Sequence, residues 1–458
     1  MIDKSRIQIE LPDKVRHIIS EIENAGYEAY AVGGCVRDSV LGRIPQDWDI
    51  TTSAKPEKIK ELFRRTIDTG IEHGTVTVML GNDGFEVTTY RIDGVYEDSR
   101  HPKDVTFTDR LTEDLRRRDF TINAMAYSDR TGIIDEFDGL ACIESRIIKA
   151  VGNPRERLSE DALRILRALR FSAQLDYEID EETKTAIREL KENLKNISAE
   201  RICTELIKLL KSDHPDRLRD AYELGVTKVI IPEFDVAMET GQNTIHHMYS
   251  VGEHIVQSLL HINEQKKLFS DRENRILKLT MLFHDLGKPE CRTIDENTGA
   301  DHFKGHPVRS KEIANNIMHR LKLDNDTINN VKILVEYHDF RPRLTFPSIR
   351  RAIVTVGQER MEMLFAVQRA DTLSQSMYER AEKLDRIKQF EEIYRTIIEN
   401  NDCISLKMLA LTGNDLIETG VKPGPEIGRI LNDLFEHVLD EPSHNTKDFL
   451  LNYAKRFM

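Results

Sequence analysis

The stretch Gly33-Gly-Cys-Val-Arg-Asp38, followed by Asp47-Trp-Asp49, decides the fold of the first part of the chain. Ala29-Tyr-Ala-Val32, directly before it, has the composition of a short β-strand. In an extended segment the side chains at positions i and i+2 point to the same side, so Asp47 and Asp49 should converge on one point. Paired carboxylates suit Mg²⁺, which binds oxygen ligands and keeps positions open for substrate phosphates. We therefore predict that Asp47 and Asp49 are catalytic and hold Mg²⁺.

The glycines and the arginine of this stretch add an anion site. Gly33 and Gly34 have no side chains, so backbone amides can approach a triphosphate closely. Arg37 brings positive charge to the same place. A pair of aspartates or a pair of glycines is common in proteins without any ligand. Here both pairs fall between positions 33 and 49, after one strand signal and before another, and the combination predicts nucleotide binding.

The sequence around this stretch, residues 1–150, alternates between helix and strand signals. An amphipathic helix pattern covers residues 11–25. Two β-rich runs, residues 75–80 and 85–90, are separated by the turn signal Gly81-Asn-Asp-Gly84. A further strand is predicted at 133–137. These signals predict a small mixed α/β domain.

From about residue 154 onward the pattern is helical almost to the end. Ser159 is expected to cap a helix that runs from Glu160 to about Phe171. Further helices are predicted at residues 181–194, 199–210, 217–224 and 251–262. We expect four domains, with boundaries that give residues 1–150, 151–215, 216–400 and 401–458.

Composition excludes several classes of protein. The 458 residues are 39% hydrophobic and carry a net charge of −13, which argues against non-specific coating by nucleic acid. Basic residues nevertheless cluster between Arg116 and Arg118 and between Arg155 and Arg170, either as a solvated helix face or as a local RNA track. No apolar run approaches the length of a membrane span. The charged N-terminus and five scattered cysteines predict a reducing, cytoplasmic location.

An ordered set of motifs extends the first stretch through residue 210. Together they resemble the class II tRNA nucleotidyltransferase and bacterial poly(A) polymerase family, within the polymerase β-like superfamily. Besides Gly33–Asp49, the motifs are His73–Val76, Glu86–Arg91, Tyr96–Pro102, Asp114–Met125, Glu160–Arg164, Arg167–Phe171 and Glu200–Glu205.

The resemblance implies an α+β chain: a nucleotidyltransferase head, then an all-α neck, a further helical domain and a helical tail. It associates Asp119 with the ribose hydroxyls and Arg116 or Arg118 with the triphosphate. One of the three consecutive arginines is expected to be only a surface ion-pair partner. Glu86 is either a third acidic group or a plain strand glutamate. The expected nucleotide-binding residues are Gly33, Gly34, Arg37, Arg116, Arg118, Asp119, Asn123, Asp161, Arg164, Arg167 and Arg170.

Asp161 and Arg164 are predicted to select the base. We expect them at positions i and i+3 of one helix, and therefore on one face. A carboxylate there accepts a hydrogen bond from the amino group of cytosine or adenine, and a guanidinium donates to a ring acceptor. Uracil and guanine present an oxygen where Asp161 needs a donor, and opposed buried groups reject a base strongly. The alternative interpretation is a simple surface ion pair.

A second constellation, rich in histidine, lies in the helical half. His254, His284-Asp285 and Asp371 follow the order of the HD phosphohydrolase domain, which they resemble. His306 and His338 resemble the extra ligands of two-metal members, although phosphate contact is a rival role for His302 and His306. Such a mixed set suits Mn, Fe, Ni or Zn. Because adjacent residues cannot point the same way on an ideal helix, we expect a helix end at His284-Asp285. His246-His247 is expected in a loop near the site entrance. The alternative is a decayed, structural domain.

The leading functional prediction is template-independent addition of CCA to the 3′ end of tRNA from CTP and ATP, with release of pyrophosphate. The runner-up is an A-adding enzyme or a poly(A) polymerase, and a third possibility is a hydrolase with an inactive head that only holds RNA. In the family that the sequence resembles, enzymes that stop at CC have lost the loop that corresponds to Arg91 to about Asp104, so its presence here disfavours such an enzyme. For the second site the expected substrates are cyclic 2′,3′-phosphates and 2′-phosphates on RNA ends. The sequence leaves the oligomeric state open.

Overall fold

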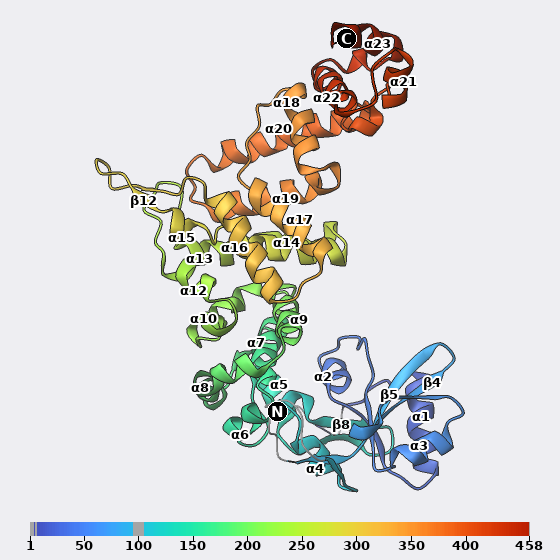
Figure 1. Ribbon diagram of the computed structural model, residues 1–458. Helices are drawn as coiled ribbons and strands as arrows, with labels where there is room; N and C mark the ends of the chain where they lie inside the picture. Colours follow the sequence, from blue (N-terminus) through green and yellow to red (C-terminus); the bar gives the residue numbers. More distant parts are fainter. Residues whose placement is uncertain (1–3, 5–6, 95–104, 458) are drawn as a thin grey trace. The chain divides into compact units, whose positions relative to one another are not determined.

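The computed structural model describes residue 4 and residues 7–94 and 105–457. The chain divides between Pro232 and Glu233 into two compact units. The first contains a β-sheet, and the second is helical (Figure 1). The predicted α+β class is therefore confirmed. The finer division at residues 150, 215 and 400 stays a prediction. The motif at Tyr96–Pro102 lies outside the described residues.

The first unit is built on a seven-stranded sheet in the order β3-β4-β5-β2-β1-β8-β9. All neighbouring strands are antiparallel except β2 and β5, which are parallel. Helices α1 and α3 pack against this sheet (Figure 1). The strands are β1 Ala29–Val32, β2 Ile50–Thr52, β3 Thr66–Gly70, β4 Thr75–Leu80, β5 Asp83–Thr89, β8 Met125–Ser128 and β9 Gly132–Asp135.

Alternation of side chains explains why the predicted strands were found near their true bounds. In β4, Val76 and Val78 are fully buried, whereas the intervening residues are partly exposed. A tight turn at Gly81-Asn82 joins β4 to β5, with Leu80 opposite Asp83. Strand β5 thus begins two residues before the predicted 85–90 run, and β9 covers Gly132–Asp135 instead of 133–137.

The register of three strands places the first chemical site. Strand β1 ends at Val32, whose amide donates to the Asp49 carbonyl over 3.0 Å. Strand β2 then begins at Ile50, which is paired with Val87 of β5. Continuing that parallel register by one residue sets Asp49 beside Glu86. The Gly33 turn, the Asp47–Asp49 segment and Glu86 therefore lie at one edge of the sheet.

One helix prediction was wrong. The run predicted from Glu160 to Phe171 is two helices, α6 Pro154–Glu160 and α7 Leu163–Leu175, separated by Asp161 in an extended conformation. Ser159 lies inside α6 and its hydroxyl donates to the Glu156 carbonyl. The Asp161 carboxylate accepts the Leu163 amide over 3.0 Å, so Asp161 acts as a local cap and interrupts the helical pattern.

Among the other helices of the first unit, α1, α8, α9 and α10 agree with the predicted ranges within a few residues, whereas α2, α3, α4, α5 and α11 were not predicted. The 181–194 prediction is α8 followed by a 3₁₀ turn, and the 217–224 prediction is a 3₁₀ turn followed by α10. These helices are α1 Asp13–Asn24, α2 Gly34–Val40, α3 Pro56–Leu62, α4 Leu111–Arg116, α5 Gly139–Ser145, α8 Glu181–Leu190, α9 Ala199–Leu210, α10 Leu218–Glu223 and α11 Thr227–Ile230.

The second unit is a helical assembly around α14, Asp271–Phe283. Ser270 and Glu273 form a reciprocal capping box at its start. Every residue from Ile276 to Phe283 is buried, as expected for a helix packed on all sides. Helices α13, α16, α17 and α19 surround it. The helices from residue 232 onward also include α12 Pro232–Glu239, α13 Val251–Glu264, α15 Lys288–Cys291, α16 His306–Arg320, α17 Asn325–Tyr337, α18 Phe346–Val356, α19 Met361–Ser374, α20 Arg380–Glu399, α21 Gly413–Glu418, α22 Pro425–Asp440 and α23 Lys447–Ala454.

Short strand pairs and a small C-terminal core complete the described chain. Helices α21, α22 and α23 share a core that includes Leu416, Leu434 and Leu450. In the residues that the structure covers, no helix combines the length and apolar character needed to cross a membrane. The short strands are β6 Arg91–Asp93, β7 Val105–Phe107, β10 Ile147–Ile148, β11 Glu178–Ile179, β12 Thr293–Ile294 and β13 Asp301–His302.

Candidate active sites in the two units

A pocket of about 210 Å³ opens at the sheet edge of the first unit. Glu86 of β5 and Asp49, which directly precedes β2, line it together with Arg117 and Arg118. The partial loss of water raises the pKa of Asp49; Arg118 opposes this rise and the charge of Asp47 adds to it. The pKa of Glu86 is raised by desolvation and then by Asp49 and Asp47. Three carboxylates that repel one another at one edge fit a divalent cation.

Gly33 is required by its backbone and by its neighbour. Its φ of 83° lies in the region that favours glycine, and an added Cβ would lie 3.0 Å from Nη1 of Arg118. Gly34 has more room, because its Cβ would meet only Arg37 at 3.7 Å. Gly33 therefore brings the backbone against the arginine that faces the carboxylates.

Buried Asp114 orients the two arginines of this pocket. Its Oδ1 lies 2.7 Å from Nη2 of Arg117, and its Oδ2 lies 3.3 Å from Nη2 of Arg118. Burial alone would raise the pKa of Asp114, but Arg117 and Arg118 lower it below its ordinary value. The sequence interpretation missed both Asp114 and Arg117, although the i, i+3 and i, i+4 spacing was a usable signal. Arg116, which was predicted to bind nucleotide, is exposed instead and pairs with Glu113.

A second pocket, of about 250 Å³, adjoins the first because both are lined by Arg117 and Arg118. The remaining lining residues come from the segment after α4, from the turn before α7, from α7 itself and from α9. They are Asp119, Asp161, Leu163, Arg164, Arg167 and Arg201. The structure therefore brings Asp161 and Arg164 into one cavity next to the carboxylate pocket.

The reasoning that paired Asp161 with Arg164 on one helix face was wrong, because Asp161 precedes α7. Oδ2 of Asp161 accepts a 2.9 Å hydrogen bond from Arg201. Arg164 is buried and donates to Glu160 over 2.6 Å and to the carbonyl oxygens of Arg157 and Arg117. The two side chains are thus held by separate partners and meet only at the pocket.

Asp119 lies at the centre of a buried polar chain. Its Oδ2 accepts from Nε of Arg167 over 2.7 Å, and its Oδ1 accepts from the Asn123 amide over 3.1 Å. Asn123 in turn accepts from Arg37 over 2.6 Å. Burial alone would raise the pKa of Asp119, but Arg167 and Asn123 hold it well below its ordinary value. Asn123 and Arg37 are placed to orient Asp119, and neither lines these two pockets within the described ranges.

Arg170 also has a mainly internal partner. Its Nε lies 2.6 Å from Glu205, and its guanidinium lies 4.0 Å from the centre of the Phe171 ring. Burial lowers its pKa to about 10, against the effect of Glu205. Arg170 was predicted to bind nucleotide, yet it lines neither pocket of the first unit as described.

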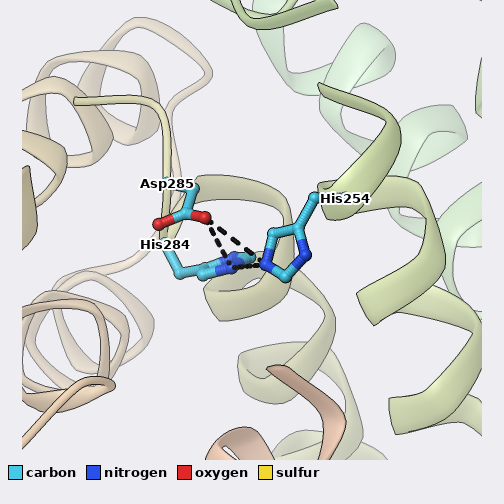
Figure 2. A group of neighbouring side chains, drawn as sticks. All are labelled: His254, His284 and Asp285. Atoms are coloured by element: carbon cyan, nitrogen blue, oxygen red, sulfur yellow. Dashed lines mark hydrogen bonds and ion pairs between the residues drawn. The ribbon is translucent and has the colours of Figure 1, made fainter. Parts of the chain in front are cut away.

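In the second unit the six predicted ligands converge on one point. Asp285 is fully buried and central: its Oδ2 lies 3.4 Å from Nε2 of both His254 and His284 (Figure 2). Its Oδ1 lies 3.3 Å from Nε2 of His306 and 3.6 Å from Nε2 of His338. Asp371 completes the group, with Oδ1 2.9 Å from Nε2 of His254. His254 and His284 therefore form one possible ligand set and His306 and His338 form another, and both sets share the carboxylate of Asp285.

The other ring nitrogen of each of these four histidines, Nδ1, faces a backbone carbonyl oxygen. Nδ1 of His284, His306 and His338 faces the carbonyl oxygens of Met281, Phe303 and Val335 at 2.7–2.9 Å, and Nδ1 of His254 faces that of Ser374 at 3.3 Å. A carbonyl only accepts, so each Nδ1 carries a proton and Nε2 is the nitrogen left to bind a metal. All four Nε2 atoms lie toward the carboxylates of Asp285 and Asp371.

This arrangement fits cations. The Nε2 atoms of His254 and His284 lie 3.2 Å apart, and those of His306 and His338 lie 3.3 Å apart. Both oxygens of Asp285 are buried without a hydrogen bond of good geometry, although Nζ of Lys288 lies 2.7 Å from Oδ2. Nitrogen and oxygen ligands of this kind suit transition metals.

The fold explains how adjacent residues can both contribute. Helix α14 ends at Phe283, so His284 is its cap and Asp285 turns away from the helix axis. This helix end confirms the prediction made from the sequence. A pocket of about 330 Å³ opens beside the cluster, with His302, His246 and His247 among its lining residues. His246 and His247 lie in the loop before α13, as predicted from the sequence.

Comparison with known proteins assigns the family. The model of the poly A polymerase head domain matches residues 29–149, that of a probable RNA and SrmB-binding site of polymerase A matches 176–238, and that of tRNA nucleotidyltransferase domain 2 matches 308–454. The CCA-adding enzyme of Levilactobacillus brevis is 35% identical over 97% of this chain and 99% of its own length. That of Enterococcus faecalis is 33% identical over 96% of this chain and 94% of its own length.

Solved structures agree with these matches. The Bacillus stearothermophilus CCA-adding enzyme in complex with CTP aligns with a TM-score of 0.69 and 26% identity, over 98% of this chain and 99% of that one. The Thermotoga maritima enzyme complexed with tRNA shares the fold, with a TM-score of 0.61 and 19% identity over 99% of this chain and all of that one. With full-length similarity above 30% identity, the chain belongs to the family of CCA-adding enzymes, which are tRNA nucleotidyltransferases.

Proposed function

We propose that the first unit adds C, C and A in turn to the 3′ end of tRNA, using CTP and ATP and releasing pyrophosphate. The observation that carries this proposal is the pair of adjoining pockets that share Arg117 and Arg118. One pocket has the carboxylates for phosphoryl chemistry, and the other has the donor and acceptor for a base. The relatives named above, including one bound to CTP, support it.

The reaction joins the 3′ oxygen of the RNA to the α-phosphorus, and the bond from that phosphorus to the departing pyrophosphate breaks. Nucleotidyltransferases of this family use a divalent metal; Mg²⁺ held by Asp47 and Asp49, with Glu86 beside them, would neutralise the charge of the triphosphate. Arg117 and Arg118, oriented by Asp114, bind the phosphates. The hydroxyl proton leaves toward the carboxylate edge of Asp47 and Asp49.

Base choice is assigned to Asp161 and Arg164. The Asp161 carboxylate accepts from the exocyclic amino group of cytosine or adenine, and Arg164 donates to the neighbouring ring nitrogen. Uracil and guanine set an oxygen against Asp161, and two opposed acceptors that have lost their water are costly. Asp119, held by Arg167, is assigned to the ribose hydroxyls.

CCA addition is favoured over A-only addition and over poly(A) synthesis, because the relatives and solved neighbours named above are CCA-adding enzymes. The decisive experiment supplies tRNA that lacks its 3′ tail with each nucleotide separately and then with all four. Incorporation of C, C and then A supports the proposal, whereas incorporation of A alone supports the runner-up. We place the reaction in the cytoplasm, on the unpaired cysteines alone.

A second function is favoured by the cluster around Asp285. We propose that the second unit hydrolyses phosphates on RNA ends, in particular 2′,3′-cyclic phosphates and 2′-phosphates, which would block the hydroxyl that the first unit needs. Transition-metal ions held by the four histidines, Asp285 and Asp371 would polarise the phosphate and activate water. The water oxygen bonds to phosphorus, the ester bond to one ribose oxygen breaks, and that oxygen takes the proton.

Lys288 and His302 line the pocket beside the cluster, where each could contact the substrate phosphate. The test uses tRNA that ends in a 2′,3′-cyclic phosphate, with Mn²⁺, Ni²⁺ or Co²⁺ added. Release of a free 3′ hydroxyl, followed by nucleotide addition, supports the coupling. A wild-type protein that leaves the cyclic phosphate intact under all three metals contradicts it.

A further inference from the structure

Three polar residues of the carboxylate pocket have no role in the reaction as described so far. Thr75, Thr88 and Arg91 line this pocket together with Asp49 and Glu86. They come from β4, from β5 and from the first position of β6. We call these three residues the threonine–arginine side of the pocket. Two hydroxyls and a guanidinium are groups that bind a ribose and a phosphate.

The order of the strands separates this side from the arginines that face the carboxylates. Four neighbouring strands of the sheet run β4-β5-β2-β1. Gly33 follows β1, and a Cβ added there would lie 3.0 Å from Nη1 of Arg118. Asp49 directly precedes β2, Glu86 belongs to β5, and Thr75 begins β4. In the order of the strands, the carboxylates therefore lie between Arg118 and Thr75.

Hydrogen bonds and strand pairing hold the threonine–arginine side in place. Thr75 and Thr88 are partners across β4 and β5, and their Oγ1 atoms lie 3.0 Å apart. Two hydroxyls have two protons and this bond uses one, so the pair can still donate one hydrogen bond. Arg91 is paired with Phe107 in the β6–β7 ladder, and its Nη1 donates to the carbonyl oxygen of His73. Arg91 is thus tied to the turn from which β4 begins.

The geometry of the reaction calls for a ligand on this side. In an in-line displacement the attacking oxygen and the leaving group lie on opposite sides of the phosphorus. The departing pyrophosphate belongs at Arg117 and Arg118, so the 3′ hydroxyl of the RNA approaches from the side of Thr75 and Arg91. The nucleotide that carries this hydroxyl brings a ribose and the last phosphodiester of the strand.

We infer that Arg91 binds the last phosphodiester of the RNA and that Thr75 and Thr88 hydrogen-bond to the terminal ribose, so that this side of the pocket positions the attacking 3′ hydroxyl. The inference rests on the proposed CCA addition. A guanidinium forms charge-assisted hydrogen bonds with phosphate oxygens whatever the base. Such a contact suits a 3′ end whose last base changes as each nucleotide is added.

The experiment measures addition of C to two tRNA substrates that lack the CCA tail. In one of them an uncharged methylphosphonate replaces the last phosphodiester. For the wild type this change should lower kcat/KM for RNA about tenfold, the order expected for one hydrogen bond to a charged group. Arg91→Gln should lower kcat/KM for the unmodified RNA by about as much and leave the KM for CTP unchanged. It should also be insensitive to the methylphosphonate, because both changes remove the same contact.

Two further variants test whether the effect belongs to the charge of Arg91. Arg91→Lys, which retains the charge, should recover part of the loss and part of the sensitivity to the methylphosphonate. Arg130→Gln is the matched control, because Arg130 is an exposed arginine of the same unit that does not line the pocket. It should keep the wild-type kinetics with both RNAs. Thermal melting of each variant reports whether it folds.

The outcomes separate the inference from the function on which it rests. A wild type that adds C equally well to both RNAs would overturn the inference, however the variants fold. An Arg91→Gln protein that has a raised KM for CTP and the full tenfold sensitivity to the methylphosphonate would also overturn it, since Arg91 would then bind the triphosphate. A wild type that adds no C to the unmodified RNA would overturn the proposed CCA addition itself.

Discussion

Arg201 of α9 and Asp161, which precedes α7, are joined by a 2.9 Å hydrogen bond across 40 positions of sequence. The bond fixes Oδ2 of Asp161, while the Leu163 amide fixes Oδ1 over 3.0 Å. Asp161 lies outside any helix, so these two donors set the direction of its carboxylate. The helix that carries Arg201 therefore controls the group to which we assign base choice.

Replacing Arg201 with methionine should impair base choice more than stability. We expect kcat/KM for CTP and ATP to fall about 10-fold to 100-fold. Without Arg201 the Asp161 carboxylate is no longer held in the orientation that binds the base, and misplaced groups contribute little to catalysis. Discrimination against UTP and GTP should fall with it. The free energy of unfolding should change by less than about 1 kcal/mol, because the ion pair is partly exposed.

Lys208→Met on the same helix is the control, since Lys208 is half exposed and lies outside the pocket. Single-nucleotide incorporation assays with all four nucleotides measure the effect. If Arg201→Met selects C and A as well as the wild type does, Arg201 is a structural ion-pair partner and no more.

Gly33→Ala should abolish nucleotide addition in a folded protein. The new Cβ would lie 3.0 Å from Nη1 of Arg118 at a φ of 83°, so the arginine that faces the carboxylates must move. Gly42→Ala is a matched control, because Gly42 has a φ of 69° but no atom within 4 Å of its Cβ position. Both variants carry backbone strain of about 1 kcal/mol or more, and thermal melting compares them. Activity that is equal in the two variants would contradict the contact with Arg118.

Sequence patterns predicted two strands at their observed bounds. In β4 the burial of side chains alternates, whereas β1 is buried throughout and was found as a short strand-forming run that ends at Gly33-Gly34. The helix break at Asp161 was missed for a local reason. Periodicity continues through residues 154–175, and only the hydrogen bond from the Leu163 amide to the Asp161 carboxylate shows that the helix stops and restarts.

The sites show the same limit. Residue type and order were enough to choose Asp285 and the five residues that the structure gathers around it, because histidines and aspartates in that order are unusual. They could not show that Asp285 is shared by two sets of ligands, since this depends on where α14, α16 and α17 begin and end. Likewise, three consecutive arginines look equal in sequence. Asp114, fully buried below them, pairs with Arg117 and Arg118, while Arg116 stays at the surface.

Mg²⁺ should stabilise the first unit more at pH 7 than at pH 4. The pKa values of Asp49 and Glu86 are raised in the folded state, so the repulsion among the carboxylates is absent at low pH, where they are protonated, and grows as pH rises through those values. A cation removes this repulsion only where the carboxylates are charged. The increase in Tm on adding Mg²⁺ should therefore be larger at pH 7.

Glu86→Gln isolates the contribution of the third carboxylate. It should raise the Tm of the metal-free protein at pH 7, shrink the increase caused by Mg²⁺ and raise the Mg²⁺ concentration needed for nucleotide addition. Scanning calorimetry with and without Mg²⁺ gives the comparison. A variant with the wild-type increase in Tm and the wild-type Mg²⁺ requirement would make Glu86 a plain strand residue.

The geometry around Asp285 predicts two transition-metal ions per chain, of which one depends on His338. Oδ2 of Asp285 faces His254 and His284, and Oδ1 faces His306 and His338. Burial, with His284 and His306, lowers the pKa of His338 to about 3, so its ring is neutral at pH 7 and offers a lone pair. His338→Ala should therefore lose one ion, and Asp285→Asn should lose both, because amide oxygen is a weaker ligand and only carboxylate carries charge.

Metal analysis after gel filtration measures the content, with His319→Ala as the control because His319 is an exposed residue of α16. Nucleotide addition to tRNA with a free 3′ hydroxyl should persist in all three variants, since its carboxylates belong to the other unit. Thermal melting separates lost ligation from lost folding. If the wild type holds one ion and His338→Ala does not change that content, the set of Asp285, His306 and His338 binds no metal. If the Asp285→Asn protein keeps its full metal content, Asp285 is not the shared ligand.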